Sequence, residues 1–388
     1  MSGDFLMEAI FWLGILLISF SYIIYPILLA IAAKMFGNSA QHKNISAITE
    51  WPEVAVVIAA FNEEQDIKKR IENLLSQDYP NDKITYFIGS DGSTDNTNSI
   101  LSEFSDPRLK TQLFDVNRGK ASVLNNLVEL VEQPIIVFSD ANTHFESDAI
   151  KRLVVHFEDK KVGAVCGELN LFNPGDNDNK DNTYWQYEQF LKEKEGQLDA
   201  LLGANGAIYS IRTHLYTPIP ANTVVDDFLI VMNVAKKKYS IVYDKSALAH
   251  EEIAPSIAEE SKRRIRIGTG NYQAFTRLYW ALNPLIGWRF FSYFSHKVLR
   301  WFTPHLMIMT LMCNVILIGN TFYNTTLLIQ IIGYAIAIWG QRSSNKGEAI
   351  PSSVAFLTFF VSMNFALLQG FYRFAFKNVK GTWQRTSR

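Results

Sequence analysis

Polar clusters recur in the middle of the chain, and each one directly follows a run of apolar residues. The three pairs of run and cluster are Val54 to Ala60 with Asn62 and Glu63, Ile84 to Gly89 with Asp91, and Ile135 to Ser139 with Asp140 and Asn142. The strands of an open parallel sheet end at one edge, and ligands bind in the crevice outside it. The spacing therefore predicts that these side chains converge on one ligand site.

Two further segments add charge to the predicted site. Gly119 and Lys120 begin a helical pattern, and a helix start beside a lysine suits an anionic or polar group. Asp226 and Asp227 also stand at the start of a helical pattern, where a carboxylate either takes part in chemistry or only caps the helix. Turn and capping roles are likewise the alternative for Asp91 and for Asp95.

The elements that position these residues are predicted to form one α/β domain. Residues 50–276 hold most of the charge, and apolar runs of strand length alternate there with helical patterns. This alternation is typical of a Rossmann-type domain built on a parallel sheet. We therefore assign residues 50–276 to a catalytic domain.

Both ends of the chain have the composition of membrane-spanning helices. Residues 9–33 carry no charge and are long enough to cross about 30 Å of hydrocarbon as a helix. Residues 301–341 also lack Asp, Glu, Lys and Arg, and a polar break at 320–326 divides them into two candidate spans. Residues 349–372 are a fourth uncharged stretch with several polar residues, and whether it crosses stays open. The predicted divisions are a first helix with a linker (1–49) and a C-terminal membrane region with a basic tail (301–388).

Residues 277–300 join the catalytic domain to this region. The segment is rich in aromatic residues, and Arg289, His296 and Arg300 are spaced to share one helical face. The pattern predicts one amphipathic helix at the membrane interface. An ordinary domain helix is the alternative.

Positively charged residues predict that the catalytic domain lies in the cytoplasm of a bacterial-type cell. The charged residues before the first apolar run are all acidic, and Lys34 and Lys43 follow that run. Arg289, Lys297 and Arg300 precede the second apolar run. The basic tail, which includes Arg385 and Arg388, would end outside if residues 349–372 crossed completely. That conflict leaves the position of the C-terminus open.

Composition excludes several classes of function. The 388 residues include 37 Lys and Arg against 38 Asp and Glu, so the formal net charge of −1 offers no broad basic face for nucleic acid. Cys166 and Cys313 lie far apart, which excludes a disulfide framework and a zinc site built on paired cysteines. A reducing compartment fits best.

The polar clusters, taken in order, resemble the nucleotide-binding half of family-two inverting glycosyltransferases with the GT-A fold. Three later segments continue the resemblance: GANGAIYSIRTHLY (203–216) resembles the acceptor-side segment, VVDDFLI (224–230) the acidic segment, and SKRRIRIGTGNYQAF (261–275) the segment written QxxRW. SHKVLRW (295–301), followed by apolar runs, is similar to membrane-bound synthases of hyaluronan, chitin, cellulose or poly-N-acetylglucosamine.

The resemblance implies a role for each cluster. Asp227 would be the general base, with Asp226 beside it, and Asp140 with Asn142 would hold Mg²⁺ or Mn²⁺ at the donor's diphosphate. The implied donor-binding residues are Asn62, Glu63, Asp91, Lys120, Arg263 and Arg264, with Arg266 adding positive charge at the diphosphate. Asn205 and Gly206 would belong to the acceptor side.

Two departures from the family pattern matter. Asn142 replaces the second carboxylate of the usual DxD motif, and an amide oxygen binds a cation more weakly. Arg263 to Ile267 replace both the Gln and the Trp of QxxRW, which puts processive synthesis in doubt. A basic face towards anionic lipid is the alternative for these arginines. Whether His250 completes the metal shell stays open.

The implied function is transfer of a sugar from a UDP-sugar onto a growing extracellular or capsular polysaccharide. The alternatives are transfer of one sugar to a polyprenyl-phosphate or other lipid acceptor, and a catalytically silent membrane scaffold or nucleotide sensor. Membrane lipids are expected partners. So few spans favour a homodimer or export subunits if a polymer is secreted.

Overall fold

The computed structural model describes residues 2–38, 45, 48, 50–172, 182–252, 257–377, 379 and 381, and these divide into two compact units. The sheet unit comprises Leu29–Pro255, Arg277–Ser292 and Val379–Arg388. The membrane-helix unit comprises Met1–Leu28, Ser256–Thr276 and Tyr293–Asn378.

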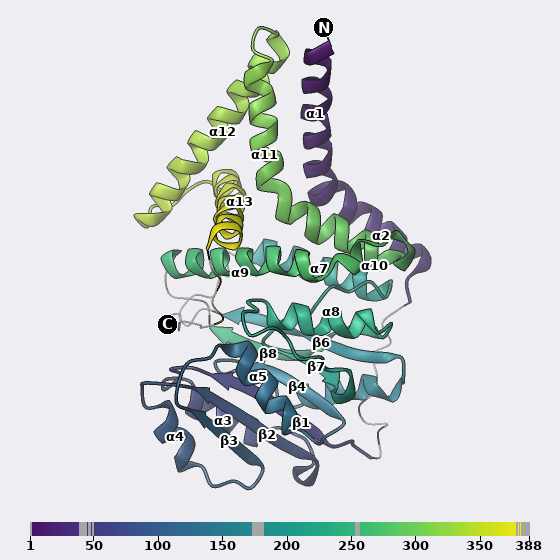
Figure 1. Ribbon diagram of the computed structural model, residues 1–388, viewed down its shortest axis with the longest axis vertical. Helices are drawn as coiled ribbons and strands as arrows, with labels where there is room; N and C mark the ends of the chain where they lie inside the picture. Colours follow the sequence, from purple (N-terminus) through teal and green to yellow (C-terminus); the bar gives the residue numbers. More distant parts are fainter. Residues whose placement is uncertain are drawn as a thin grey trace. The chain divides into compact units, whose positions relative to one another are not determined.

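One eight-stranded sheet forms the centre of the sheet unit, in the order β3-β2-β1-β4-β7-β6-β8-β5 (Figure 1). Strands β3, β2, β1 and β4 run parallel, and the direction changes where β4 pairs antiparallel with β7. Strand β6 pairs antiparallel with β7 and parallel with β8, which also pairs with β5. The strands are β1 Val54–Ala60, β2 Ile84–Asp91, β3 Leu109–Phe114, β4 Ile135–Asp140, β5 His144–Phe145, β6 Val162–Phe172, β7 Tyr209–Arg212 and β8 Ser240–Glu252. The α/β fold predicted from the sequence is confirmed.

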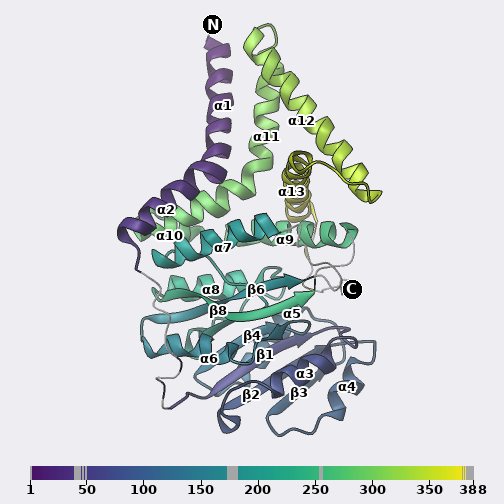
Figure 2. The same ribbon diagram turned by 180° about the vertical axis from the view of Figure 1, so that it is seen from behind.

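Helices cover both faces of this sheet (Figure 1 and Figure 2). On one face, α3, α4 and α6 pack on alternate residues of the central strands. On the other face, Val123 and Leu127 of α5 approach β2 so closely that a side chain at Gly89 would collide with them. The helices of the unit are α3 Ile67–Leu75, α4 Thr97–Glu103, α5 Lys120–Glu129, α6 Ala149–Val154, α7 Asn182–Gln197, α8 Asp226–Lys236 and α10 Trp288–Ser292.

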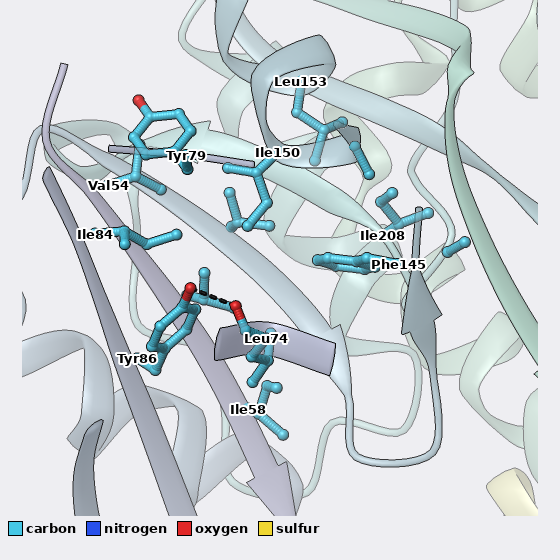
Figure 3. Packing of buried hydrophobic residues seen from close by; sticks show 14 of the residues in the cluster. Val54, Ile58, Leu74, Tyr79, Ile84, Tyr86, Phe145, Ile150, Leu153 and Ile208 are labelled. Carbon is cyan, nitrogen blue, oxygen red and sulfur yellow. Dashed lines mark hydrogen bonds between the residues drawn. The ribbon is translucent and has the colours of Figure 1, made fainter. Parts of the chain in front are cut away.

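Burial on both faces explains the uninterrupted apolar runs in the sequence, because a covered parallel strand has no solvent side. Every residue of β1 is buried. Figure 3 shows the face under α3, where Val54 of β1 lies near Ile84 and Ile58 lies near Leu74 of α3. The Tyr86 hydroxyl group is buried there and donates a hydrogen bond to the carbonyl oxygen of Leu74 (Figure 3).

The membrane-helix unit is built from long helices that pack through small residues. Helix α1 Ser2–Ser19 continues through a π-helical stretch into α2 Tyr25–Phe36, and α1 packs along α11 Leu299–Ile316, where Gly14 lies against Thr310. Helix α12 Thr321–Asn345 packs on α13 Ser352–Phe376 through Gly340. Helix α9 Ile257–Arg277 crosses α13.

Three helices among the described residues are long and apolar enough to cross a membrane: Asp4–Phe36, Thr321–Asn345 and Ser352–Phe376. The first agrees with the predicted span, and the last shows that residues 349–372 have sufficient helical length. Helix α11 is not among the three, because Arg300, Pro304 and Asn314 interrupt its apolar sequence. The predicted break at 320–326 is shorter than expected, since Asn320 caps α12 and the polar residues after it are helical.

The single amphipathic helix predicted from Leu278 to Arg300 is wrong in its first half. Two 3₁₀ turns, Tyr279–Leu282 and Pro284–Ile286, occupy that part, and Gly287 with a φ of 65° follows them. A proline and a residue with positive φ both disfavour a continuous helix. A helix runs only from Trp288 onward. The basic residues Lys43, Arg385 and Arg388 lie outside the described residues.

Candidate active site

Asp91, at the end of β2, fastens the start of α5. Its two carboxylate oxygens accept hydrogen bonds from the backbone amides of Arg118 and Gly119, each over 2.8 Å. Gly119 has a φ of 90°, which disfavours residues with a side chain, and Lys120 is the first residue of the helix. The buried Asp91 therefore positions Lys120, in addition to its predicted contact with the nucleotide.

The loops after β1 and β2 are joined by side-chain hydrogen bonds. The side-chain oxygen of Asn62 accepts a hydrogen bond from the backbone amide of Thr94, and the backbone amide of Asn62 donates to the Ser93 hydroxyl group. The amide of Glu63 donates to the Thr97 hydroxyl group, and Asp95 accepts from the amide and hydroxyl groups of Thr97. Asp95 therefore accepts the hydrogen bonds of the turn that precedes α4. Asn62 and Glu63 lie at the predicted edge of the sheet.

Lys120 joins two carboxylates that are far apart in the sequence. Its ammonium nitrogen lies 2.7 Å from Oδ1 of Asp140, at the end of β4, and 3.3 Å from Oδ2 of Asp226, in the first turn of α8. These contacts raise the pKa of the lysine above its ordinary value against the opposing effect of burial. The lysine is therefore a permanent cation among carboxylates.

Asp227 is the carboxylate best suited to accept a proton. Desolvation, followed by repulsion from Asp226, raises its pKa to about 6, although Lys120 acts in the opposite direction. The space beside it is left open by Gly206: a β-carbon there would lie 3.4 Å from Oδ2 of Asp227 and 3.6 Å from Oδ2 of Asp140. Asp140 and Asp227 thus face the same small space, as the sequence predicted.

Asn205, the neighbour of Gly206, is held from behind. Its side-chain amide donates to the carbonyl oxygen of Gly167 over 3.1 Å, and its side-chain oxygen accepts a hydrogen bond from Lys192 of α7. The backbone amide of Asn205 donates to the Cys166 thiol. The donor and the acceptor group of the Asn205 side chain are therefore both used in positioning the segment that contains Gly206.

Arg70 of α3 is a site residue that the sequence analysis missed. Its side chain is fully buried, and burial lowers its pKa to about 9. The guanidinium group donates to the Ser139 hydroxyl group over 2.8 Å, and Ser139 donates in turn to the carbonyl oxygen of Ala207 over 2.7 Å. Arg70 therefore connects the strand end that carries Asp140 to the segment that carries Gly206. Its position on the apolar face of α3, beside Ile67, Ile71 and Leu74, was the available signal.

The residues at the end of β4 suit a divalent cation that is shared with a ligand. Within the described residues, no group of three or more His, Cys, Asp or Glu could hold a metal ion by itself. Mg²⁺ and Mn²⁺ are commonly held by one or two carboxylates together with substrate phosphates, a donor set that Asp140 fits. The side-chain nitrogen of Asn142 is buried and has no hydrogen-bond partner among the residues that the structure describes. His250, which the sequence left open as a ligand, instead pairs with Glu146 over 2.8 Å.

The three predicted arginines lie on α9, in the membrane-helix unit. Arg264 donates a hydrogen bond to Glu260 over 2.8 Å and lies over the ring of Phe359, while Arg263 is 3.8 Å from the same glutamate. Arg266 is exposed. The role of these residues at the diphosphate stays a prediction.

Parts of this chain are similar to known proteins. Residues 55–212 match the family model described as Glycosyl transferase family 2. A poly-beta-1,6-N-acetyl-D-glucosamine synthase from Staphylococcus epidermidis is 25 % identical over 235 residues, which are 59 % of this chain and 57 % of that protein. A beta-monoglucosyldiacylglycerol synthase from a Nostoc species is 34 % identical over 130 residues, 32 % of this chain and 28 % of that protein. These alignments thus span less than two thirds of either relative.

A solved structure shares the fold. A mannosyltransferase from Pyrobaculum calidifontis, in complex with GDP-mannose and Mn²⁺, superposes with a TM-score of 0.72 over 95 % of this chain and 99 % of that one, at 19 % sequence identity. The resemblance at this identity concerns the fold alone.

Proposed function

The chain is a family 2 glycosyltransferase, and on that premise we propose that it transfers a hexose or N-acetylhexosamine from a UDP-sugar onto a growing polysaccharide. The observation that carries the proposal is the meeting of Asp140, Lys120, Asp226 and Asp227 beside the open space at Gly206. A sugar donor needs positive charge at its diphosphate, and an acceptor hydroxyl group needs a base. Both are present here.

The proposed reaction is a single displacement with inversion. Asp227 would take the proton of the acceptor hydroxyl group as its oxygen bonds to the anomeric carbon from the face opposite the leaving group. The bond from that carbon to the diphosphate breaks, and its electron pair leaves with UDP. A base whose pKa is raised to about 6 is still mostly ionised at neutral pH and accepts a proton more readily than an ordinary carboxylate.

The donor side would hold the diphosphate by charge. Lys120, which pairs with Asp140 and Asp226, would add its positive charge beside the diphosphate, and Asn62, Glu63 and Asp91 would lie around the nucleotide. A divalent cation, when bound, would be held by Asp140 with the side-chain oxygen of Asn142 and would stabilise the charge on the departing diphosphate. We retain Arg266, with Arg263 or Arg264, as additional positive charge there, and Asn205 and Gly206 as the acceptor side.

The poly-N-acetylglucosamine synthase aligns over more than half of this chain and supports a polymeric product. A second candidate, transfer of one sugar to a lipid, is favoured by the higher identity to a glucolipid synthase over a shorter segment. In either case the catalytic domain is proposed to face the cytoplasm, on the evidence of the basic residues that flank the membrane helices. A homodimer or export subunits would complete a secretion path.

The test is incorporation of radiolabel by membranes that contain the protein. UDP-glucose, UDP-N-acetylglucosamine and GDP-mannose are supplied in turn, with and without EDTA, and polymer is separated from lipid extract. The proposal expects EDTA-sensitive label in polymer from one UDP-sugar, and none with Asp227→Asn. Label only in the lipid extract would establish the second candidate. Nucleotide binding without transfer to any supplied acceptor would favour a silent scaffold.

A further inference from the structure

The membrane-helix unit contains a cavity of about 450 Å³ that the proposed reaction does not use. Its lining comes from α9 and the C-terminal half of α13: Ile265, Leu368, Gln369, Tyr372, Arg373 and Lys377. All of these residues belong to one compact unit. The cavity therefore belongs to the packing of two helices.

A close crossing of α9 and α13 explains why the cavity exists. A β-carbon at Gly370 would lie 2.6 Å from the carbonyl carbon of Gly268 and 2.7 Å from the amide nitrogen of Thr269. The two backbones touch at this point because both residues are glycines, and crossing helices diverge on either side of their contact. Ile265 lies one turn before the crossing on α9, and Arg373 and Lys377 lie one to two turns after it on α13. These residues line the space where the helices separate.

The lining has an apolar part and a cationic part. Ile265, Leu368 and the ring of Tyr372 supply the apolar surface. Arg373 and Lys377 are exposed, and neither forms an ion pair with a carboxylate among the described residues. Lys377 lies 5.9 Å from the centre of the Tyr372 ring. By contrast, Arg263 and Arg264 on α9 already share Glu260, so the two cations of α13 are the ones available to an anion.

We propose that this cavity binds one anionic phospholipid of the surrounding membrane. The phosphate would lie between Arg373 and Lys377, and one acyl chain would extend along Ile265 and Leu368. Basic pockets between membrane helices bind anionic head groups for the same reason, since the surface potential and the apolar lining act together. Helix α13 is apolar and long enough to cross the membrane, so acyl chains are available along its length. A free phosphate could use the two cations but not the apolar lining. The proposal does not depend on the reaction proposed above.

The test measures lipid binding to the purified full chain in phosphatidylcholine nanodiscs. A phosphatidylglycerol with a fluorescent acyl chain is titrated into the wild type and into Arg373→Gln/Lys377→Gln. The matched control is Arg342→Gln/Lys346→Gln, which removes the same charge from exposed residues at the end of α12. The affinity of the first variant should fall about fivefold for each cation removed, equivalent to ~1 kcal/mol per residue, and that of the control should not change.

A second variant keeps the cations and fills the cavity. Leu368→Trp should weaken binding of phosphatidylglycerol while the variant retains its thermal unfolding temperature in detergent. Equal losses in the pocket and control variants would overturn the proposal, since they would indicate only general surface charge. Undiminished binding in Leu368→Trp, or displacement of the lipid by inorganic phosphate at similar concentrations, would also overturn it. If a polyprenyl phosphate displaced the phosphatidylglycerol and then received sugar, the cavity would be an acceptor site. That result would also overturn the proposal of a resident phospholipid.

Discussion

The two halves of the sheet hold their carboxylates in opposite ways. In the parallel half, Asp91 accepts two backbone amide hydrogen bonds, and Asp140 lies 2.7 Å from the ammonium group of Lys120. In the other half, Asp227 is desolvated beside a second carboxylate, so its pKa is raised to about 6. One half thus engages its carboxylates in amide hydrogen bonds and an ion pair, and the other holds a carboxylate that can take up a proton.

This difference divides the work of one site. Carboxylates such as Asp91 and Asp140 suit a polar nucleotide and a cation, whereas a carboxylate with a raised pKa, such as Asp227, suits proton transfer. The two halves meet where β4 pairs with β7, close to the Gly206 space. Variants on either side should therefore change different steps.

The largest effect is expected from Asp227→Asn. The amide cannot accept the acceptor's proton, so kcat for sugar transfer should fall by about 10² to 10⁴-fold. UDP affinity, measured by calorimetry, should stay nearly unchanged because the nucleotide is assigned to the parallel half. Turnover at the wild-type rate would refute the assignment of the base.

Asp140→Ala should have the next largest effect, in the parallel half. Loss of the carboxylate should reduce transfer about 10- to 100-fold and abolish the response of activity to added Mn²⁺. Asp95→Ala serves as the control, because Asp95 lies at the same edge but accepts hydrogen bonds of the turn before α4. An unchanged response to Mn²⁺ would remove Asp140 from the site.

The pH profile tests the comparison without a substitution in either half. Transfer needs the ionised base, so kcat should fall about tenfold per pH unit below the Asp227 pKa of about 6. The free energy of unfolding should respond to pH in the opposite direction to kcat. Between pH ~4 and ~6 the folded protein binds more protons at Asp227 than the unfolded chain does, so the free energy of unfolding should decrease as pH rises through this window. Thermal unfolding of wild type and Asp227→Asn across this range checks it, and the variant should lack that contribution.

The smallest effect on activity is expected from Arg70→Met, which acts on both halves at once. Ser139 and Asn73 would lose a charged donor, at a cost of ~1 to 3 kcal/mol in unfolding free energy, while removal of a buried charge partly offsets that loss. Transfer should fall only several-fold, since Arg70 acts through Ser139. Arg108→Met, which breaks a surface pair with Asp106, is the matched control, and equal transfer rates in the two variants would exclude a positioning role.

The parallel half could be predicted well because its signals are local. A continuous apolar run followed by Asn62, Asp91 or Asp140 specifies a buried strand and the residue at its end, and the observed strands agree to within about two residues. The sequence also placed Asp226 and Asp227 at the start of a helix, as observed. These inferences need only neighbours in the chain.

What could not be predicted depends on residues that meet across the sequence. The contact of Lys120 with Asp226, and that of Ser139 with Ala207, appear only once the sheet is assembled. The prediction of one helix over residues 277–300 was wrong for a different reason. The aromatic and basic residues fit one helical face, but Pro284 and Gly287 impose turns that this pattern does not take into account. Whether α9 brings its arginines to the diphosphate stays a prediction.

The change of strand direction at β4 also affects the order in which the sheet can form during protein synthesis. The parallel strands are complete once the ribosome has released residue 140, whereas β7, which covers the free edge of β4, begins at Tyr209. Asp226 follows later still, 226 − 140 = 86 residues after Asp140. During synthesis the growing chain therefore carries an open strand edge, the kind of surface that pairs with other chains. Closing that edge and assembling the four charged side chains both wait for later parts of the chain, so a polypeptide interrupted between Asp140 and Tyr209 would be exposed to aggregation and also inactive.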